Sequence, residues 1–374
     1  SRGLGDVYKR QALLEEICLD LYETAAQEQR SGELETIRKI IQRFGGRGYP
    51  AVDCKNQVNM TEAAQVLQFC KAVDKKGEAG LTVFEVDYRE GVVKYDLQTK
   101  EGNVQVQRSY YRYENGAIRR KSLESYPAED WKYTKEGYLM FKGVHFSEER
   151  YAQTLSMAEK HTALRVAPLD ETCRELNRTY ILPIGYAYNN MFLTDWNEND
   201  FGKLNFYDMY DIFYEKLYRK SLPYTEDKNV GVRAVYQIPE EEFEPVLMRH
   251  FRIDPETLRS KTVYGSENGS YAYSPRGIEE TEYPEYPYPE VFDFKENSDG
   301  TITLLVRAVF PYAGDSDVYV HEVVVRLLKN GGVQYVSNRI THGGENGGTV
   351  WHTPRLTPGG QREKAISIPQ AQRE

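Results

Sequence analysis

The hydrophobic and polar residues change from a helical period to a strand period twice along the chain. Apolar side chains first recur every three or four residues, which is the spacing of one face of an α-helix. They then alternate with polar side chains, as they do along a half-buried β-strand. The second half of the chain repeats this succession of helices followed by antiparallel strands. The pattern therefore predicts an α+β protein of two domains, each with helices packed on an antiparallel sheet.

The first half of the chain predicts helices followed by an antiparallel meander. We expect three helices, at residues 12–30, 34–44 and 59–74, and the last of these has Asn59 at its N-cap and Glu62 at the N3 position. Glycine-containing turns then separate strands at residues 81–88, 92–98, 104–113, 118–126, 131–134 and 138–146.

The second half predicts shorter helices and a final meander between residues 290 and 340. Asp170 and Asn205 are expected to cap helices at residues 169–182 and from residue 206. Further helices begin at Glu240 and at Pro255, the second capped by Asp254, and a strand covers residues 270–274. The meander consists of strands at residues 301–310, 318–328 and 333–340. Helices upstream are expected to cover its apolar face.

These elements divide the chain into five segments. Residues 1–11 resemble the translated adapter of a sequencing library, so we exclude them from the fold and expect a truncated reading frame from metagenomic DNA. An N-terminal domain covers residues 12–150, a linker 151–165 and a C-terminal domain 166–340. Residues 341–374 lose the apolar pattern and predict a flexible tail. Any signal peptide or lipid-attachment cysteine would lie upstream of residue 12.

Composition narrows the class of partner. The chain has 374 residues, a formal net charge of −9 and no long block of basic residues, so nucleic acid is not an expected partner. The 30 tyrosines suit half-buried sheet positions, with the ring against the core and the hydroxyl in water. Four cysteines are too few for a disulfide scaffold, although a bridge between Cys18 and Cys70 would be possible in an oxidising compartment.

Histidine supplies the one catalytic candidate. His321 shares a strand face with Tyr319 and Val323, and a sheet histidine near tyrosines could transfer protons in a pocket. A place in the core is the favoured interpretation. The chain contains no phosphate-binding loop, nucleophile elbow or His-Glu-x-x-His sequence, so no cofactor is expected.

Two further segments offer candidates for binding. Asp195, Asn197 and Asn199 place oxygen atoms at alternate positions, as a calcium loop does, but the glycine and glutamate of an EF-hand are missing and a capped polar loop is favoured. The segment at residues 283–289 is extended because of its three prolines. It could present the rings of three tyrosines to a partner, namely Tyr283, Tyr286 and Tyr288.

Two resemblances extend this picture. The order of elements resembles the cystatin-like and nuclear-transport-factor-2-like folds. The stretches ELNRTYILPIGY at residues 175–186 and QYVSN at residues 334–338 resemble an uncharacterised family of extracytoplasmic lipoproteins from Gram-positive gut anaerobes. That resemblance implies a location in the cell envelope, contact with the membrane only through a lost N-terminal lipid anchor, and an envelope, peptide or glycan ligand.

Three hypotheses for function follow. The favoured one is a non-catalytic lipoprotein of the cell envelope that binds or scaffolds a partner. The alternative is an isomerase-like or dehydratase-like enzyme with a pocket between helices and sheet. A protease inhibitor of the cystatin type ranks last, because residues 57–60, QVNM, do not match the Gln-x-Val-x-Gly loop of such inhibitors.

Overall fold

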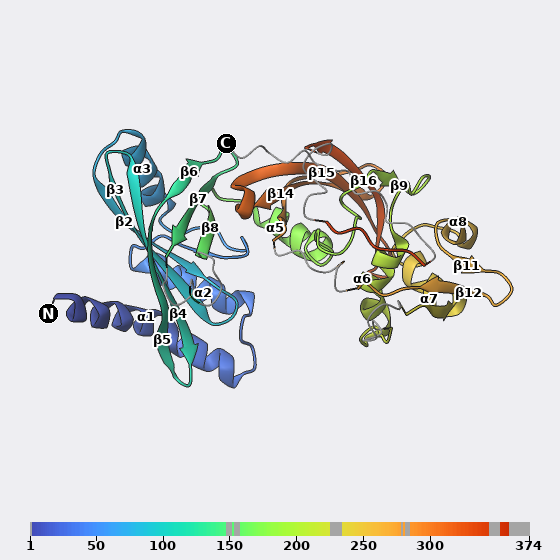
Figure 1. Cartoon of the computed structure of the whole chain (residues 1–374), viewed down its shortest axis with the longest axis horizontal. Helices are drawn as coiled ribbons and strands as arrows, with labels where there is room; N and C mark the ends of the chain where they lie inside the picture. Colours follow the sequence, from blue (N-terminus) through green and yellow to red (C-terminus); the bar gives the residue numbers. More distant parts are fainter. Residues whose placement is uncertain are drawn as a thin grey trace. The chain divides into compact units, whose positions relative to one another are not determined.

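The chain forms two compact units, residues Ser1–Leu169 (unit 1) and Asp170–Glu374 (unit 2). The structure, a computed structural model, describes residues 2–146, 152, 158–224, 234–277, 280, 285–343 and 352–358. Helices and antiparallel strands occur in both units, so the predicted α+β class is confirmed (Figure 1). Within the described residues, no helix has the length and apolar character needed to cross a bilayer.

Unit 1 is built on a five-stranded sheet with the order β1-β2-β3-β4-β5. All neighbours pair antiparallel except β1 and β2, which are parallel. The strands are β1 (Ala51–Asp53), β2 (Ala79–Val86), β3 (Gly91–Lys100), β4 (Asn103–Glu114) and β5 (Ala117–Pro127). A second, three-stranded sheet follows, with β6 (Glu129–Tyr133), β7 (Tyr138–His145) and β8 (Ala158–Arg165).

Both faces of the large sheet of unit 1 are covered, because alternate side chains of β3 enter different cores. Val92 joins the core that is formed with α1 (Arg2–Gln27) and α2 (Leu34–Gly46). Val93 joins the core that is formed with α3 (Ala63–Asp74) and the three-stranded sheet. Cys18 belongs to the first core and Cys70 to the second, and both thiols are free. The bridge considered from the sequence is therefore not formed.

Unit 2 carries a second five-stranded sheet, with the order β13-β14-β15-β16-β9 and antiparallel pairing throughout. Its strands are β13 (Tyr288–Glu296), β14 (Thr301–Phe310), β15 (Asp315–Leu327), β16 (Val333–His342) and β9 (Trp196–Asn197). A 3-10 turn, η3 (Pro311–Ala313), joins β14 to β15. The meander predicted at the end of the chain is thus present, and a two-residue strand from far upstream completes it.

Helices and a small sheet account for the rest of unit 2. The small sheet has the order β10-β12-β11. Its strands are β10 (Tyr236–Pro239), β11 (Tyr264–Gly265) and β12 (Ser270–Tyr273). The helices are α5 (Glu171–Leu176), the π-helical turn η1 (Asn177–Ile181), α6 (Phe206–Tyr218), α7 (Glu240–Met248) and α8 (Pro255–Ser260).

Three side chains cap helices of unit 2 as the sequence predicts. Asp170 accepts hydrogen bonds from the first turn of α5, Asn205 from that of α6 and Asp254 from that of α8. In unit 1, the cap expected at Asn59 is wrong. The Asn59 Oδ1 instead accepts from the Leu169 amide at 2.9 Å, and α3 begins only at Ala63.

Tyrosines fill the interior of unit 2, and their hydroxyls bind protein groups. Tyr210 donates to Glu242 at 2.9 Å, and Tyr271 donates to Glu244 at 2.7 Å. Tyr335 donates to the carbonyl of Tyr180, also at 2.7 Å. The expectation that tyrosine hydroxyls lie in water is wrong for these residues. Each is fully buried, so an unbonded hydroxyl would carry a desolvation cost.

Two predicted boundaries are also wrong. Residues 158–165, expected in the linker, form β8 and pair with β7 along its whole length. Residues 352–358, expected in the flexible tail, pack on unit 2 and bury Arg355. The excluded N-terminal segment is helical from Arg2 onward, as part of α1.

Candidate functional site

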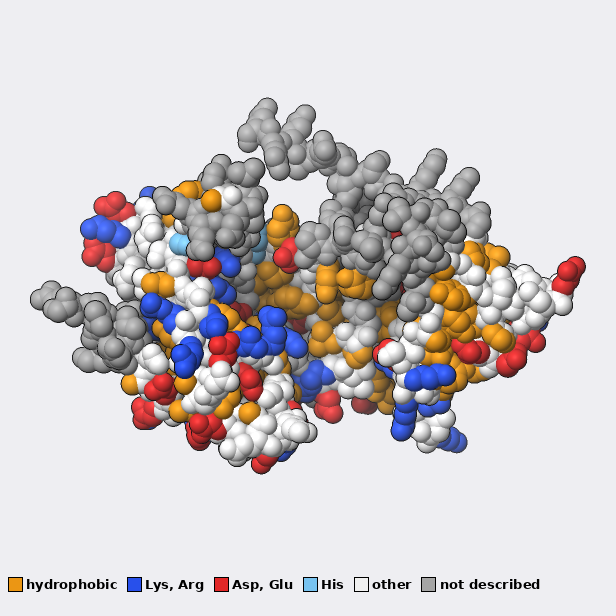
Figure 2. All heavy atoms as spheres, turned by 60° about the horizontal axis from the view of Figure 1, so that its bottom comes forward, with side chains coloured by type: hydrophobic (Ala, Val, Ile, Leu, Met, Phe, Trp, Pro, Cys, Tyr) orange, Lys and Arg blue, Asp and Glu red, His pale blue; other side chains and the backbone are white. Residues whose placement is uncertain are grey.

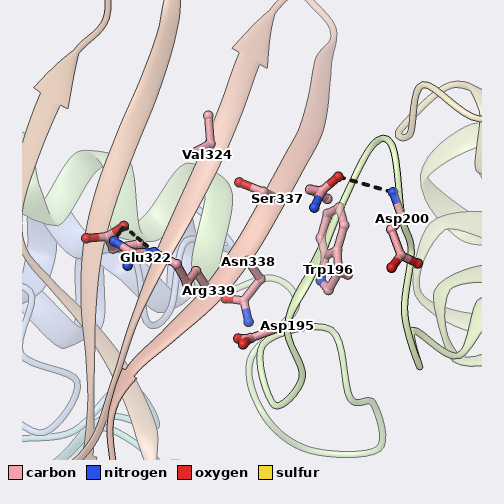
Figure 3. A pocket seen from close by; sticks show the side chains of 9 residues that line it. Asp195, Trp196, Asp200, Glu322, Val324, Ser337, Asn338 and Arg339 are labelled. Atoms are coloured by element: carbon pink, nitrogen blue, oxygen red, sulfur yellow. Dashed lines mark hydrogen bonds and ion pairs between the residues drawn. The ribbon is translucent and has the colours of Figure 1, made fainter.

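An open pocket of about 440 Å³ lies where β9 meets β15 and β16 at the edge of the unit 2 sheet. It is wide enough for a small ligand and open to solvent (Figure 3). Most of the side chains that line it are polar; they are Asp195, Trp196, Asn197, Asp200, Glu322, Val324, Ser337, Asn338 and Arg339.

Strand alternation brings the charged side chains of the pocket to the outer face of the sheet. Along β15, Glu322 and Val324 are partly exposed, whereas their neighbours His321 and Val323 are buried. On β16, Arg339 is exposed in the same way, and it pairs across the strands with Glu322. Glu322, Val324 and Arg339 therefore point away from His321, which does not line the pocket.

The wall contributed by residues 195–200 is fixed by a buried indole. Trp196 is 3% exposed, and its Nε1 donates to the carbonyl of Met191 at 2.8 Å. Its ring stacks on Phe201 with a centroid distance of 6.0 Å. Because the indole is anchored in the core, the polar residues on either side of it are held at the rim of the pocket.

The three calcium candidates lie in or beside this wall, and side-chain oxygens of two of them, Asp195 and Asn197, accept hydrogen bonds from backbone amides. The Oδ1 of Asn197 accepts from the amides of Asn199 and Asp200 at 2.9 Å and 3.1 Å. The Oδ1 of Asp195 accepts from the Ile340 amide at 2.6 Å, which ties the loop to β16. Asn199 does not line the pocket. In the described part of the chain, no group of three or more His, Cys, Asp or Glu residues is placed to hold a metal ion.

The pocket has a negative formal charge and several polar atoms available to a ligand. Arg339 donates through Nε and Nη2 to the Oε2 of Glu322, and the shorter of these bonds is 2.6 Å. Among the bonds of the described residues, none uses the Oε1 of Glu322, the Nη1 of Arg339 or the second carboxylate oxygens of Asp195 and Asp200. Three carboxylates and one guanidinium favour a ligand that donates hydrogen bonds.

His321 is fully buried and is held at both ring nitrogens. The Nε2 lies 2.8 Å from the hydroxyl of Tyr186, and the Nδ1 lies 2.7 Å from the Oδ1 of Asn338. The amide of Asn338 donates to the carbonyl of Thr194, so its Oδ1 faces the imidazole as an acceptor. Burial lowers the pKa of His321 to about 3, which keeps the ring neutral. The imidazole therefore acts as a hydrogen-bonded polar group inside the core, between Tyr186 and Asn338.

The structure places the tyrosine candidates separately from the pocket. Tyr283 lies outside the described residues. Tyr286 is 47% exposed, and Tyr288 begins β13 at the far edge of the sheet from β9. Neither Tyr286 nor Tyr288 therefore lines the pocket.

Sequence reasoning found one side of this pocket and missed the other. The sequence predicts Asp195 and Asn197 as candidate metal ligands, but Glu322 and Arg339 were not predicted as site residues. A signal for them exists, because they are charged residues at outward positions of strands whose inward positions are apolar. The local sequence does not predict that β9, some 140 residues earlier in the chain, pairs with β16 and closes the pocket.

The fold and the pocket define a two-unit α+β protein with an open polar pocket on one sheet. The chain belongs to the family of unknown function DUF6070, whose model matches residues 6–355. No curated protein and no solved structure matches the chain. The sequence predicts membership in an uncharacterised family, and the match to this family model confirms that membership.

Proposed function

We propose that the protein is a non-catalytic binding or scaffolding protein of the cell envelope, and that the pocket at β9, β15 and β16 is its recognition site. One observation carries the proposal. Carboxylate, amide and guanidinium groups line an open pocket that the buried His321 does not reach. Such a site is equipped to hold a polar ligand in place.

The chemistry of the rim favours a hydroxyl-rich ligand such as a glycan segment. Neighbouring hydroxyls of a sugar can donate to the exposed oxygens of Asp200 and Glu322. The Nη1 of Arg339 can donate to a ring or carbonyl oxygen of the same ligand. The negative charge of the pocket disfavours polyanions, which lack hydrogen-bond donors and would be repelled by the carboxylates.

Titration with soluble glycans tests this proposal. Cell-wall fragments and neutral oligosaccharides would be screened by saturation-transfer NMR, and binders would be measured by calorimetry against the intact protein. The double variant Asp200→Asn with Glu322→Gln should bind at least tenfold more weakly, because hydrogen bonds to charged groups contribute roughly 1.5–3 kcal/mol each.

The matched control is Glu296→Gln, which removes an exposed carboxylate from β13, at the far edge of the same sheet. Its affinity should equal that of the unaltered protein. Binding of a glycan with the same affinity by the double variant would place the recognition site elsewhere.

The location and the anchor belong to the same proposal. Export and lipid attachment are supported by the resemblance to envelope lipoproteins of Gram-positive gut anaerobes. The natural gene tests them directly. A charged start, a short apolar run and a lipid-attachment cysteine upstream of residue 12 would support an envelope location. A start codon immediately before residue 12 would contradict it.

A further inference from the structure

The side chain of Arg355 lies in a closed cage on α6 and at the end of β12. Its Nη2 donates to the carbonyl of Ser274 at 2.6 Å. Its Nη1 donates to Asp208 at 3.3 Å and also to Asp211. The guanidinium lies 4.9 Å from the ring centre of Tyr273. No part of this side chain is exposed, and the segment that carries it crosses α6 (red in Figure 1).

Other residues hold the acids of this cage in position. Asp208 receives three hydrogen bonds from the guanidinium of Arg276, at 3.0–3.2 Å. Asp211 receives a hydrogen bond from the hydroxyl of Tyr273 at 2.6 Å. Asp208 and Asp211 lie three residues apart on α6, so they face the same side of that helix. The cage is therefore organised by contacts that do not involve Arg355.

The charges of the cage require a cationic guest. Two carboxylates bind the guanidinium of Arg355, and they belong to Asp208 and Asp211. The guanidinium of Arg276 is the cation bound beside them. Without a guest, two carboxylates and the one guanidinium of Arg276 would leave one uncompensated negative charge beside the buried Asp208, which is unfavourable. The two carboxylates accept from Nη1 and the carbonyl of Ser274 accepts from Nη2, so the acceptors lie around both ends of one planar group, which fits a guanidinium better than an ammonium.

The chain around the guest is held through its backbone. The carbonyl of Thr353 accepts from Arg276 at 2.7 Å, and the amide of Leu356 donates to Glu280 at 2.9 Å. Residues 352–358 pair with no strand among those described. Backbone contacts do not depend on side-chain identity, so an extended segment of another chain with arginine at the same place could make them equally well.

We infer that this cage is a binding site for an arginine side chain in an extended peptide, and that residues 353–356 occupy it as an internal ligand. A partner peptide with arginine would compete with this segment for the cage. The cage shares no residue with the pocket at β9, β15 and β16, so this inference does not depend on the proposed function.

The first test uses the full chain with Arg355→Ala. Ethylguanidinium should restore part of the lost melting temperature, because it can fill the vacated cage, whereas methylammonium at the same concentration should not. If Arg355→Ala fails to fold, it is refolded with ethylguanidinium, and Arg355→Lys, which keeps a cation in the cage, is measured in parallel. If ethylguanidinium stabilises or refolds Arg355→Ala no better than methylammonium does, the inference is overturned.

The second test measures competition. A labelled peptide with the sequence of residues 352–358, HTPRLTP, should bind Arg355→Ala or Arg355→Lys at least tenfold more tightly than it binds the unaltered protein, as read by fluorescence anisotropy. The same peptide with citrulline in place of arginine, which is neutral, should not bind. Equal binding of the two peptides, or equal affinity for variant and unaltered protein, would show that Arg355 has a structural role only.

Discussion

The imidazole of His321 is held by partners that are distant in sequence. Tyr186 lies 135 residues before it, and Asn338 lies 17 residues after it on the neighbouring strand. The strand period alone predicts that position 321 faces inward. It does not say whether an inward histidine meets a cavity or two hydrogen-bond partners, because those partners belong to other elements. The fully bonded ring here explains how a histidine is accommodated in an apolar core.

The first prediction concerns pH. Burial lowers the pKa of His321 and His352 to about 3 and that of His250 to about 4. In the unfolded chain a histidine titrates near pH 6.5. Between these values the unfolded state binds more protons than the folded state. The free energy of unfolding of unit 2 should therefore fall as the pH falls below about 6.5, by up to about 1.4 kcal/mol per pH unit for each histidine.

Denaturant unfolding between pH 4 and pH 8 would measure this slope. In the variant His321→Gln, residue 321 cannot be protonated, so the slope should be smaller by the contribution of about one proton. This variant should also have a lower free energy of unfolding than the unaltered protein at pH 8. A slope that does not change in His321→Gln would contradict the neutral, buried state of this ring.

At the scale of elements, the sequence predicts the long strands well and the short ones poorly. β2 to β5 run for eight to twelve residues each between glycine-containing turns, so the sequence marks them clearly even where both faces of a strand are buried, as in the first half of β3. β1 has only three residues, all buried, and no alternation is visible in so short a run. Most of the predicted α+β fold therefore follows from period and turns. Parallel pairing of β1 depends on contacts that the local sequence does not specify.

The second prediction concerns the cap of α6. The Oδ1 of Asn205 accepts from the amides of Tyr207 and Asp208 at 3.0 Å and 3.2 Å. Asn205→Ala should lower the free energy of unfolding by about 1 kcal/mol, because two amides of the first turn lose their partner. Asn205→Asp keeps the acceptor and should retain most of the stability in thermal melts. Equal losses in the two variants would show that the cap is not the cause.

At the scale of the whole molecule, charged and apolar side chains are interspersed over the visible surface of unit 1, at the left of Figure 2. Each unit has its own buried core, and that of unit 2 includes Arg355 from residues 352–358, on which its stability is expected to depend. The prediction of a flexible tail was wrong for these residues because the partners of Arg355 lie 144 and 147 residues earlier. A segment without apolar pattern gives no local sign of such burial.

The third prediction follows from this dependence. Residues 2–169 and residues 170–358 should each melt cooperatively when produced separately, with a near-UV circular dichroism signal that shows ordered aromatic rings. Residues 170–343 should not, because breaking a buried ion pair by removing one partner costs roughly 3–5 kcal/mol. A shorter piece that melts at the same temperature as residues 170–358 would show that Arg355 is dispensable for folding.

The position of Arg355 also has a consequence for how the protein is made. Chains are synthesised from the N-terminus, and domains fold as their residues become available. The carboxylates of α6 must wait for an arginine that emerges 144 residues after Asp211. Until then unit 2 is expected to remain incomplete and accessible to chaperones and proteases. A chain that is broken off shortly before residue 355 would carry unbalanced buried charge, so the cell could distinguish it from a finished one.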